Sequence, residues 1–287
     1  MSLYRSWMFV PGSDSRKIEK TRQLEADVII FDLEDAVAVS EKEVARTKVK
    51  QALQQYPRPY NVVRVNAANT PYFIEDVKEM VKYGAKAIML PKSETSEQIL
   101  LLKEILSNAE KEQGLDYTID IIPLIESARG VHQVDQIAAS STRIKCLAFG
   151  SVDYALDIDG ELTKEGFELL YARSRIVNVS RAIGIEQPID AVFTDIKDRE
   201  GLKKETQFVK RLGFQGKLVV HPNQIDVVNQ AFVPSKEDIE NAQLIISAYM
   251  ESSQEGSGAV EVNGKMVDYP IVERAKRILE KAQAVSC

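Results

Sequence analysis

Eight short apolar runs, rich in β-branched residues, recur along most of this chain, and amphipathic helical segments separate them. Strands that are apolar along their whole length are typical of a parallel sheet with helices on both faces. Eight strand–helix units in roughly 220 residues favour an α/β fold, a TIM-like (β/α)8 barrel. An open doubly wound sheet is the alternative, but no G-x-G-x-x-G sequence follows any of the runs. The runs span residues 6–12, 27–35, 61–66, 86–92, 118–126, 144–153, 189–195 and 217–222.

The barrel pattern ends near residue 230, which divides the chain into a barrel domain of residues 1–230 and a C-terminal helical extension of residues 231–287. Helix start signals support both parts, because Thr95 with Gln98 and Ser235 with Asp238 have the spacing of a capping box. The polar, glycine-containing residues 251–265 are predicted to form a mobile loop between two helices of the extension.

The charge and hydropathy of the chain exclude several classes of protein. Lys and Arg number 37 against 43 Asp and Glu, a net charge of −6, so a general nucleic-acid or membrane surface is not expected. No run approaches the ~18 apolar residues of a membrane span, and the first residues lack the layout of a signal peptide. Cys146 and Cys287 are too few for a disulfide framework or a Cys-based metal site. We therefore expect a cytoplasmic protein.

Charged and polar side chains gather where the predicted strands end. In a barrel of parallel strands these carboxyl ends open onto one mouth, where the active sites of such barrels lie. Several acids together with one arginine and one lysine predict a metal-assisted site for an anionic substrate. The residues are Asp32, Glu34, Asp35, Arg64, Asn66, Lys92, Glu126, Asp153, Asp195 and His221.

Glu126 and Asp153 are predicted to end the fifth and sixth strands. Adjacent strands lie about 4.8 Å apart, so both carboxylates can bind one ion. Two carboxylates, with the other positions open to water and substrate oxygens, suit Mg²⁺, and the absence of histidine from both positions disfavours zinc. The alternative is that both acids stabilise the starts of the following helices, where the helix dipole favours negative charge.

Arg64 and Lys92 are the candidate substrate-binding cations. A guanidinium grips a carboxylate through two parallel hydrogen bonds, so Arg64 is predicted to bind an anionic substrate. A structural salt bridge to Asp32 or Glu34 is the alternative, and both can hold together, because such a partner would also fix the arginine. Lys92 is predicted to bind or orient substrate, with a solvated loop lysine as its alternative.

The remaining polar candidates favour structural roles. His132 falls in a helical stretch, and His221, at a strand end, is at least as consistent with a structural hydrogen bond as with catalysis. Ser127 and Ser151 adjoin the carboxylates without an obvious histidine base, so a Ser-His-Asp hydrolase is rejected. Cys146 is expected in the core.

These residues lie in a series of motifs that resembles the citrate lyase β-subunit (CitE-like) family of the wider aldolase/malyl-CoA lyase superfamily. The motifs occur in family order and cover nearly the whole chain; each is weak alone, but their combination is highly specific. They are RSWMFVPGSDSRKIEK, ADVIIFDLEDAV, VRVN, LPK, PLIES, FGSVDY, LVVHPNQI and VNGKMVDYPIVERA.

The resemblance implies a TIM-like barrel with Mg²⁺ on Glu126 and Asp153 and with Arg64 binding substrate. It also implies that Glu126 contacts substrate as well as metal, and that Asp32 and Glu34 belong to the same polar shell. Known members cleave or form a carbon–carbon bond in 3-hydroxyacyl thioesters carried by CoA or an acyl-carrier protein. Cleavage releases an acetyl thioester and a 2-oxo acid, and bond formation consumes them.

The resemblance also implies a function for the C-terminal extension. In related lyases the aspartate of the NGKM(V/I)D motif, here Asp268, comes from a neighbouring subunit and acts as acid and base. That implies a homo-oligomer, with a trimer favoured. The alternative is that the motif is only a turn, since Asn263-Gly264 is a turn signal.

Three functions stay open at this point. The first is a lyase acting on a CoA thioester such as malyl-CoA or citramalyl-CoA, for which Arg5, Arg16 and Lys17 are candidate phosphate contacts. The second is a citrate lyase β subunit acting on a citryl thioester of an acyl-carrier protein; a malate-synthase-type thioester hydrolysis is a further variant on the same site. The third is a non-catalytic scaffold subunit. The presence of Arg64, Glu126, Asp153 and Asp268 argues against this third function.

Overall fold

Eight parallel strands close into a barrel, each hydrogen-bonded to the next in chain order and β8 to β1. The structure is a computed structural model, and it describes residues 4–56, 58, 60–254 and 257–286. The predicted (β/α)8 barrel is confirmed, although β6 and β7 are much shorter than their apolar runs. The strands are β1 (Ser6–Pro11), β2 (Val28–Asp32), β3 (Asn61–Arg64), β4 (Ala87–Leu90), β5 (Asp120–Ile125), β6 (Ala148–Phe149), β7 (Ile189–Asp190) and β8 (Gly216–Val219).

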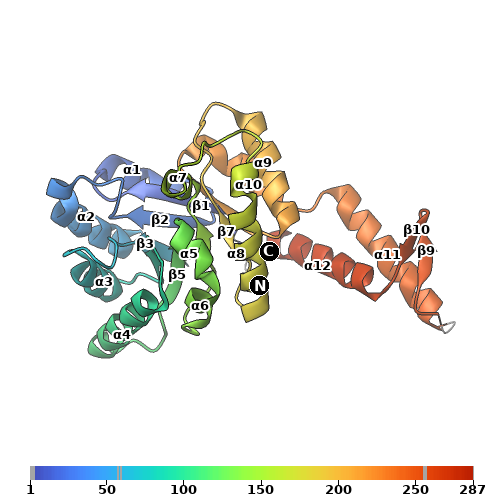
Figure 1. Cartoon of the computed structure of the whole chain (residues 1–287), viewed down its shortest axis with the longest axis horizontal. Coiled ribbons are helices and arrows are strands. Elements are labelled where there is room, and N and C mark those ends of the chain that lie inside the picture. The colour runs from blue at the N-terminus through green and yellow to red at the C-terminus, as the bar shows by residue number, and fades with distance from the viewer. Residues whose placement is uncertain (1–3, 57, 59, 255–256, 287) are drawn as a thin grey trace. The chain divides into compact units, whose positions relative to one another are not determined.

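Helices follow the strands and cover the outside of the barrel (Figure 1). Each buries one apolar face; α4, for example, buries Ile99, Leu102 and Leu106 at helical spacing. The predicted capping box of Thr95 and Gln98 is confirmed at the start of α4. These helices are α1 (Ser15–Lys20), α2 (Lys42–Gln55), α3 (Phe73–Lys82), α4 (Ser96–Gln113), α5 (Ala128–His132), α6 (Val134–Ala139), α7 (Ser151–Asp157), α8 (Leu170–Ile183) and α9 (Arg199–Leu212).

Apolar side chains fill the inside of the barrel. They come from all eight strands or their immediate approaches, and they are almost fully excluded from solvent, which makes this a packed core rather than a channel. Only the residues at and beyond the carboxyl ends of the strands are therefore placed to meet a ligand. The buried members are Trp7, Val28, Ile30, Tyr60, Val62, Ala87, Met89, Ile122, Leu124, Cys146, Ala148, Ile189 and Leu218.

Strand register places the residues of the mouth. Asp32, the last residue of β2, lies opposite Arg64, the last residue of β3. On the other side of the mouth, Ile125 of β5 lies opposite Phe149 of β6. Glu126 and Gly150 directly follow this second pair, so the two residues leave adjacent strands at the same level.

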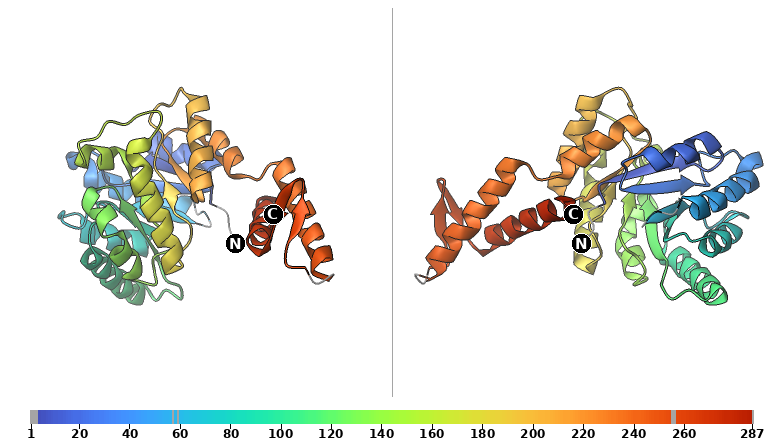
Figure 2. Two further views of the ribbon diagram at one scale, coloured as in Figure 1. Left: turned by 45° about the vertical axis from the view of Figure 1, so that its right-hand side comes forward. Right: turned by 180° about the vertical axis from the view of Figure 1, so that it is seen from behind.

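The chain divides into two compact units, one of Tyr4–Asn229 and one that begins at Gln230; α10 (Ile225–Phe232) runs across the boundary. In the second unit α11 (Lys236–Gln254) packs along α12 (Tyr269–Ser286), as Figure 2 shows. The predicted capping box of Ser235 and Asp238 is confirmed, because the Ser235 amide donates to Asp238 and the Asp238 amide donates to Ser235.

A β-hairpin corrects the predicted loop of residues 251–265. Helix α11 continues to Gln254, and β9 (Val260–Val262) pairs antiparallel with β10 (Lys265–Val267). Asn263 and Gly264 form the tip with φ of 50° and 75°, the two left-handed positions that an Asn-Gly hairpin turn needs. The polar and glycine-containing residues that predicted a loop thus belong in part to a hairpin and its turn.

Within the described ranges, none of the helices combines the length and the apolar character of a membrane span. Cys146 is a free, buried thiol in the barrel core, as predicted. Cys287 lies outside the described residues.

Candidate active site

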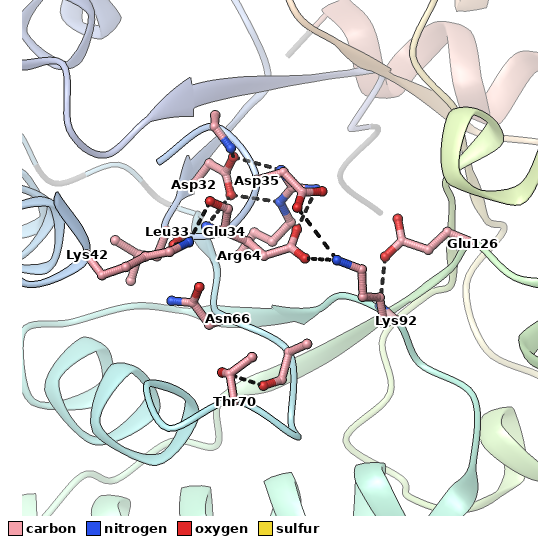
Figure 3. Close-up of polar contacts among 12 residues, drawn as sticks. Asp32, Leu33, Glu34, Asp35, Lys42, Arg64, Asn66, Thr70, Lys92 and Glu126 are labelled. Carbon is pink, nitrogen blue, oxygen red and sulfur yellow. Dashed lines mark hydrogen bonds and ion pairs between the residues drawn. The ribbon is translucent and has the colours of Figure 1, made fainter. Parts of the chain in front are cut away.

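Asp32 and Arg64 form a bidentate ion pair at the mouth of the barrel (Figure 3). Arg64 donates from Nε and Nη2 to the two carboxylate oxygens of Asp32, both at 2.7 Å. The same oxygens accept from the backbone amides of Glu34 at 2.9 Å and Ala36 at 3.2 Å. Burial disfavours the charge of Arg64, but the interactions with Asp32, Glu34 and Glu126 together raise the pKa of the guanidinium. The salt bridge considered from the sequence is therefore present, and it fixes the arginine.

Glu34 joins Arg64 to Lys92. Its Oε1 accepts a 2.6 Å hydrogen bond from Lys92 Nζ, and its Oε2 lies 3.2 Å from Arg64 Nη1. Burial raises the pKa of Glu34, with Arg64 and Lys92 opposing the rise. Burial also disfavours the charge of Lys92, but its hydrogen bond to Glu34 and the negative charges of Glu34, Asp35 and Glu126 together raise the pKa of the amine. The Lys92 side chain is 47% exposed, so it is open to a ligand as well as paired.

Lys42 is a site residue that the sequence analysis missed. It begins α2, yet its amine is buried and donates to the carbonyl oxygens of Leu33 at 2.8 Å and Glu34 at 2.7 Å (Figure 3). Burial lowers the pKa of this amine. The lysine thereby fixes the backbone of the segment that carries Asp32 and Glu34. A single lysine within a charged helix start gives no sequence signal for this role.

Glu126, directly after β5, is 4% exposed. Its Oε1 accepts a 2.7 Å hydrogen bond from the backbone N–H of Lys92, whose φ of 50° is in the left-handed region. Burial, with the nearby charge of Asp153, raises the pKa of Glu126 to about 8. A carboxylate in this position is costly unless a positive charge meets it.

The sequence predicted Asp153 at the end of the sixth strand, and this prediction is wrong. Strand β6 stops at Phe149, and Asp153 lies in the first turn of α7. It is still near enough to Glu126 to act on the ionisation of that carboxyl. The helix-start alternative and the metal alternative are thus compatible, since the first turn of a helix favours an acid.

Asp268 lies in the second unit, between β10 and α12. Its carbonyl oxygen accepts from the amides of Ile271 and Val272, both at 3.1 Å, so its backbone begins α12. The side chain is half-buried. The motif around Asp268 is therefore a hairpin followed by a helix start, which agrees with the turn alternative.

Two predicted mouth residues have local structural contacts instead. Asp195 lies five residues beyond the end of β7, is exposed, and accepts from the amides of Lys197 at 3.0 Å and Asp198 at 3.2 Å. His221 precedes a short 3-10 helix, and its Nδ1 accepts from the Asn223 amide at 3.2 Å. The strand-end prediction is wrong for Asp195, because β7 is only two residues long.

Ser127 and His132 lie at the two ends of α5. Ser127 caps the start of the helix, where its Oγ accepts from the Gly130 amide at 3.1 Å, and His132 is exposed at the other end.

Arg5 does not belong to the mouth. It precedes β1, at the opposite end of the barrel, and forms a bidentate pair with Asp27 at 2.8 Å from both Nε and Nη2. The expectation of a phosphate contact from Arg5 is therefore wrong. Arg16 and Lys17, by contrast, are exposed in α1, which follows the carboxyl end of β1.

A closed parallel barrel, with a fixed arginine and buried carboxylates at the carboxyl ends of its strands, defines a TIM-barrel protein with a polar site at its mouth, where enzymes of this fold bind substrate. Residues 5–222 match the family model described as HpcH/HpaI aldolase/citrate lyase, and residues 167–286 match the model described as C–C bond lyase of the TIM-barrel fold. The chain belongs to the HpcH/HpaI aldolase/citrate lyase family and is a carbon–carbon lyase, as the motif resemblance implied.

Relatives with known names are similar over nearly their whole length. Citrate lyase subunit beta of Leuconostoc mesenteroides is 42% identical, over 98% of this chain and 94% of its own. Human mitochondrial citramalyl-CoA lyase is 32% identical, over 98% and 86%. The crystal structure of Mycobacterium tuberculosis CitE in complex with magnesium, acetoacetate and coenzyme A superposes with a TM-score of 0.82 at 30% identity, over 97% and 98%.

Proposed function

We propose that this protein is a Mg²⁺-dependent lyase that cleaves, or forms, a 3-hydroxyacyl-CoA thioester such as malyl-CoA or citramalyl-CoA, with acetyl-CoA and a 2-oxo acid as the products of cleavage. The observation that carries the proposal is Glu126, a buried carboxyl whose pKa is raised to about 8 beside Asp153. A cation between the two carboxylates would offset the cost of both charges. The relatives named as citramalyl-CoA lyase and the magnesium complex of CitE support the same assignment.

Glu126 and Asp153 are the residues that would hold the magnesium ion. Among the described residues, no cluster of three or more His, Cys, Asp or Glu side chains is placed to ligate an ion. Two carboxylates nevertheless fit Mg²⁺, which keeps several water or substrate oxygens in its remaining positions. When bound, the ion supplies Lewis acidity at the oxygen that becomes the ketone of the 2-oxo acid.

Arg64 binds and orients the carboxylate of the substrate. A guanidinium has five N–H donors. Asp32 accepts hydrogen bonds from Nε and Nη2, and the carboxylates of Glu34 and Asp35 lie 3.2 and 4.0 Å from Nη1. The remaining N–H groups are available to a second carboxylate. Because the arginine is fixed before substrate arrives, little side-chain entropy is lost on binding. Lys92, half exposed beside Glu34, adds a second positive charge for the same anion.

Asp268 moves the proton at the acetyl carbon. When the 3-hydroxyl group releases its proton to water, the carbon–carbon bond breaks and gives the 2-oxo acid and the enolate of the acetyl thioester. Asp268 in its acid form then protonates the enolate carbon and regains a proton from water; in the other direction its carboxylate removes a methyl proton. We propose that the C-terminal extension of a neighbouring copy delivers Asp268, which makes a homo-oligomer, with a trimer favoured, necessary for activity. Arg16 and Lys17 are the candidate contacts for the phosphates of the thioester carrier.

A second candidate is the β subunit of a citrate lyase, acting on a citryl thioester of an acyl-carrier protein and releasing oxaloacetate. The 42% identity to the Leuconostoc subunit favours it. A non-catalytic scaffold subunit is not favoured, because the arginine, both carboxylates at the metal site and Asp268 are all present.

One assay separates these candidates. The purified protein is incubated with Mg²⁺ and malyl-CoA, citramalyl-CoA or citryl-CoA, and in the other direction with acetyl-CoA and glyoxylate, pyruvate or oxaloacetate. Turnover of a free CoA substrate, abolished by EDTA, supports the first candidate. Turnover that begins only when an acyl-carrier protein bears the thioester supports the second. Absence of turnover in both formats supports a scaffold.

A further inference from the structure

Gly150 lies directly against the side chain of Glu126. It follows β6, and its amide donates to the carbonyl oxygen of Ile125 at 2.9 Å. A β-carbon added to Gly150 would lie 2.6 Å from Glu126 Oε2 and 2.7 Å from Glu126 Cβ, closer than real β-carbons approach other atoms. The three nearest atoms to that position all belong to Glu126. The backbone of Gly150 has φ of −110°, which any residue adopts, so space rather than conformation requires glycine here.

Glu126 has little freedom to make room for a larger residue. The Lys92 amide holds its Oε1 at 2.7 Å on the other side, and the side chain is 4% exposed. Rotation of the carboxylate would relieve the contact at Oε2. It would not relieve the contact at Cβ, whose position the backbone at the end of β5 sets.

We propose that Gly150 is a positioning residue for the metal site: its missing side chain is what lets the Glu126 carboxylate lie between the ends of β5 and β6, facing Asp153. This inference rests on the proposed function, because it takes Glu126 as a ligand of the magnesium ion. Any side chain at position 150 displaces that carboxylate and weakens the binding of Mg²⁺, while Arg64, Asp32 and Glu34 keep their arrangement on the other half of the mouth.

The first test is the affinity of the full-length protein for Mg²⁺, measured by isothermal titration calorimetry. Gly150→Ala is expected to bind at least tenfold more weakly than the natural protein. Gly160→Ala is the matched control, because the nearest atoms to a β-carbon there are Cδ1 and Cγ1 of the Ile158 side chain at 3.2 and 3.3 Å. Equal affinity of Gly150→Ala and the natural protein overturns the inference. Failure of the natural protein to bind Mg²⁺ overturns the proposed function instead.

Thermal unfolding in EDTA tests the steric cause without any metal and covers the case of a Gly150→Ala protein that folds poorly. The contact with Glu126 is expected to lower the unfolding temperature of Gly150→Ala by several degrees. In a Glu126→Gly background, which removes all three crowding atoms, the same substitution is expected to change it little. A loss of equal size in both backgrounds shows that Gly150 does not act through Glu126 and overturns the inference.

Discussion

Arg64 meets Asp32 edge to edge, through two hydrogen bonds of 2.7 Å at the ends of neighbouring strands. The face of the same guanidinium lies 4.7 Å from the centroid of the Phe9 ring, a distance at which a cation and an aromatic ring attract. Contacts from β1 and β2 thus hold the arginine, at the end of β3, in one orientation before any ligand binds.

Replacement of Arg64 by lysine is expected to remove most of the activity although the charge is kept, because an ammonium group cannot make the paired, planar contacts of a guanidinium. We expect kcat/KM for the thioester to fall roughly 100-fold, about 3 kcal/mol, in steady-state assays at saturating Mg²⁺. Arg181→Lys, on the exposed face of α8, serves as the control. Comparable activity of Arg64→Lys and the natural protein would exclude Arg64 as the substrate anchor.

Lys42→Met is expected to loosen the segment that carries Asp32 and Glu34. The substitution keeps the buried aliphatic stem but leaves the carbonyl oxygens of Leu33 and Glu34 without this donor. We expect unfolding in urea to show a loss of about 1–3 kcal/mol, together with a higher KM for the thioester. Lys78→Met, exposed on α3, should leave both quantities unchanged. A stable Lys42→Met protein with a natural KM contradicts the positioning role.

The stability of the metal-free protein is expected to fall as the pH rises through about 8. The pKa of Glu126 is raised from its ordinary 4.5 to about 8, so the folded chain holds a proton that the unfolded chain releases. This contribution is fully present below pH 4.5 and is lost as the pH passes 8; its size is about a few kcal/mol.

Unfolding temperatures in EDTA, measured between about pH 5 and 9, check this pH dependence. Other groups titrate in the same range, so the readout is the difference between the natural protein and Glu126→Gln, which lacks the titrating carboxyl. Addition of Mg²⁺ at high pH should stabilise the natural protein far more than the variant. Parallel curves for the two proteins would show that Glu126 titrates at an ordinary pH.

Asp268→Asn is expected to lose most of its activity while it keeps the Mg²⁺ affinity of the natural protein, since this residue moves a proton and does not ligate the ion. Delivery from a neighbouring copy has a separate readout. When Asp268→Asn and Arg64→Lys chains, each with little activity alone, are mixed under conditions that exchange subunits, some sites combine a natural Arg64 with a natural Asp268, and activity should rise well above that of either variant. A mixture no more active than its components would place both residues of a site in one chain.

Most of the barrel could be predicted from the sequence because its strands are apolar over their whole length and recur regularly. The same pattern misplaced Asp153 and Asp195, because an apolar run does not show where hydrogen bonding between strands stops. Strands β6 and β7 have two residues each, and their runs continue as loops and as the start of α7. The hairpin of residues 260–267 was missed because its strands have only three residues each.

Charged residues that become buried could not be found in the same way. Lysine side chains are normally exposed, and nothing in the sequence around Lys42 and Lys217 predicts otherwise, yet both are buried. Lys217 Nζ lies 2.6 Å from an oxygen of Asp190, and Lys42 donates to two backbone carbonyl oxygens. Such positions depend on which charged or polar groups the fold brings together from distant parts of the chain. The pairing of Asp32 with Arg64 could be predicted only because the two residues end consecutive strands, which lie side by side in a barrel.

Lys92 joins the two halves of the mouth through different parts of one residue: its backbone amide reaches Glu126, and its amine reaches Glu34. The first contact depends on a left-handed backbone, which glycine and asparagine adopt more readily than lysine. A substitution at position 92 therefore affects the two contacts differently. A homologue with glycine at position 92 would keep the backbone hydrogen bond to Glu126 without backbone strain. It would lose only the amine that pairs with Glu34.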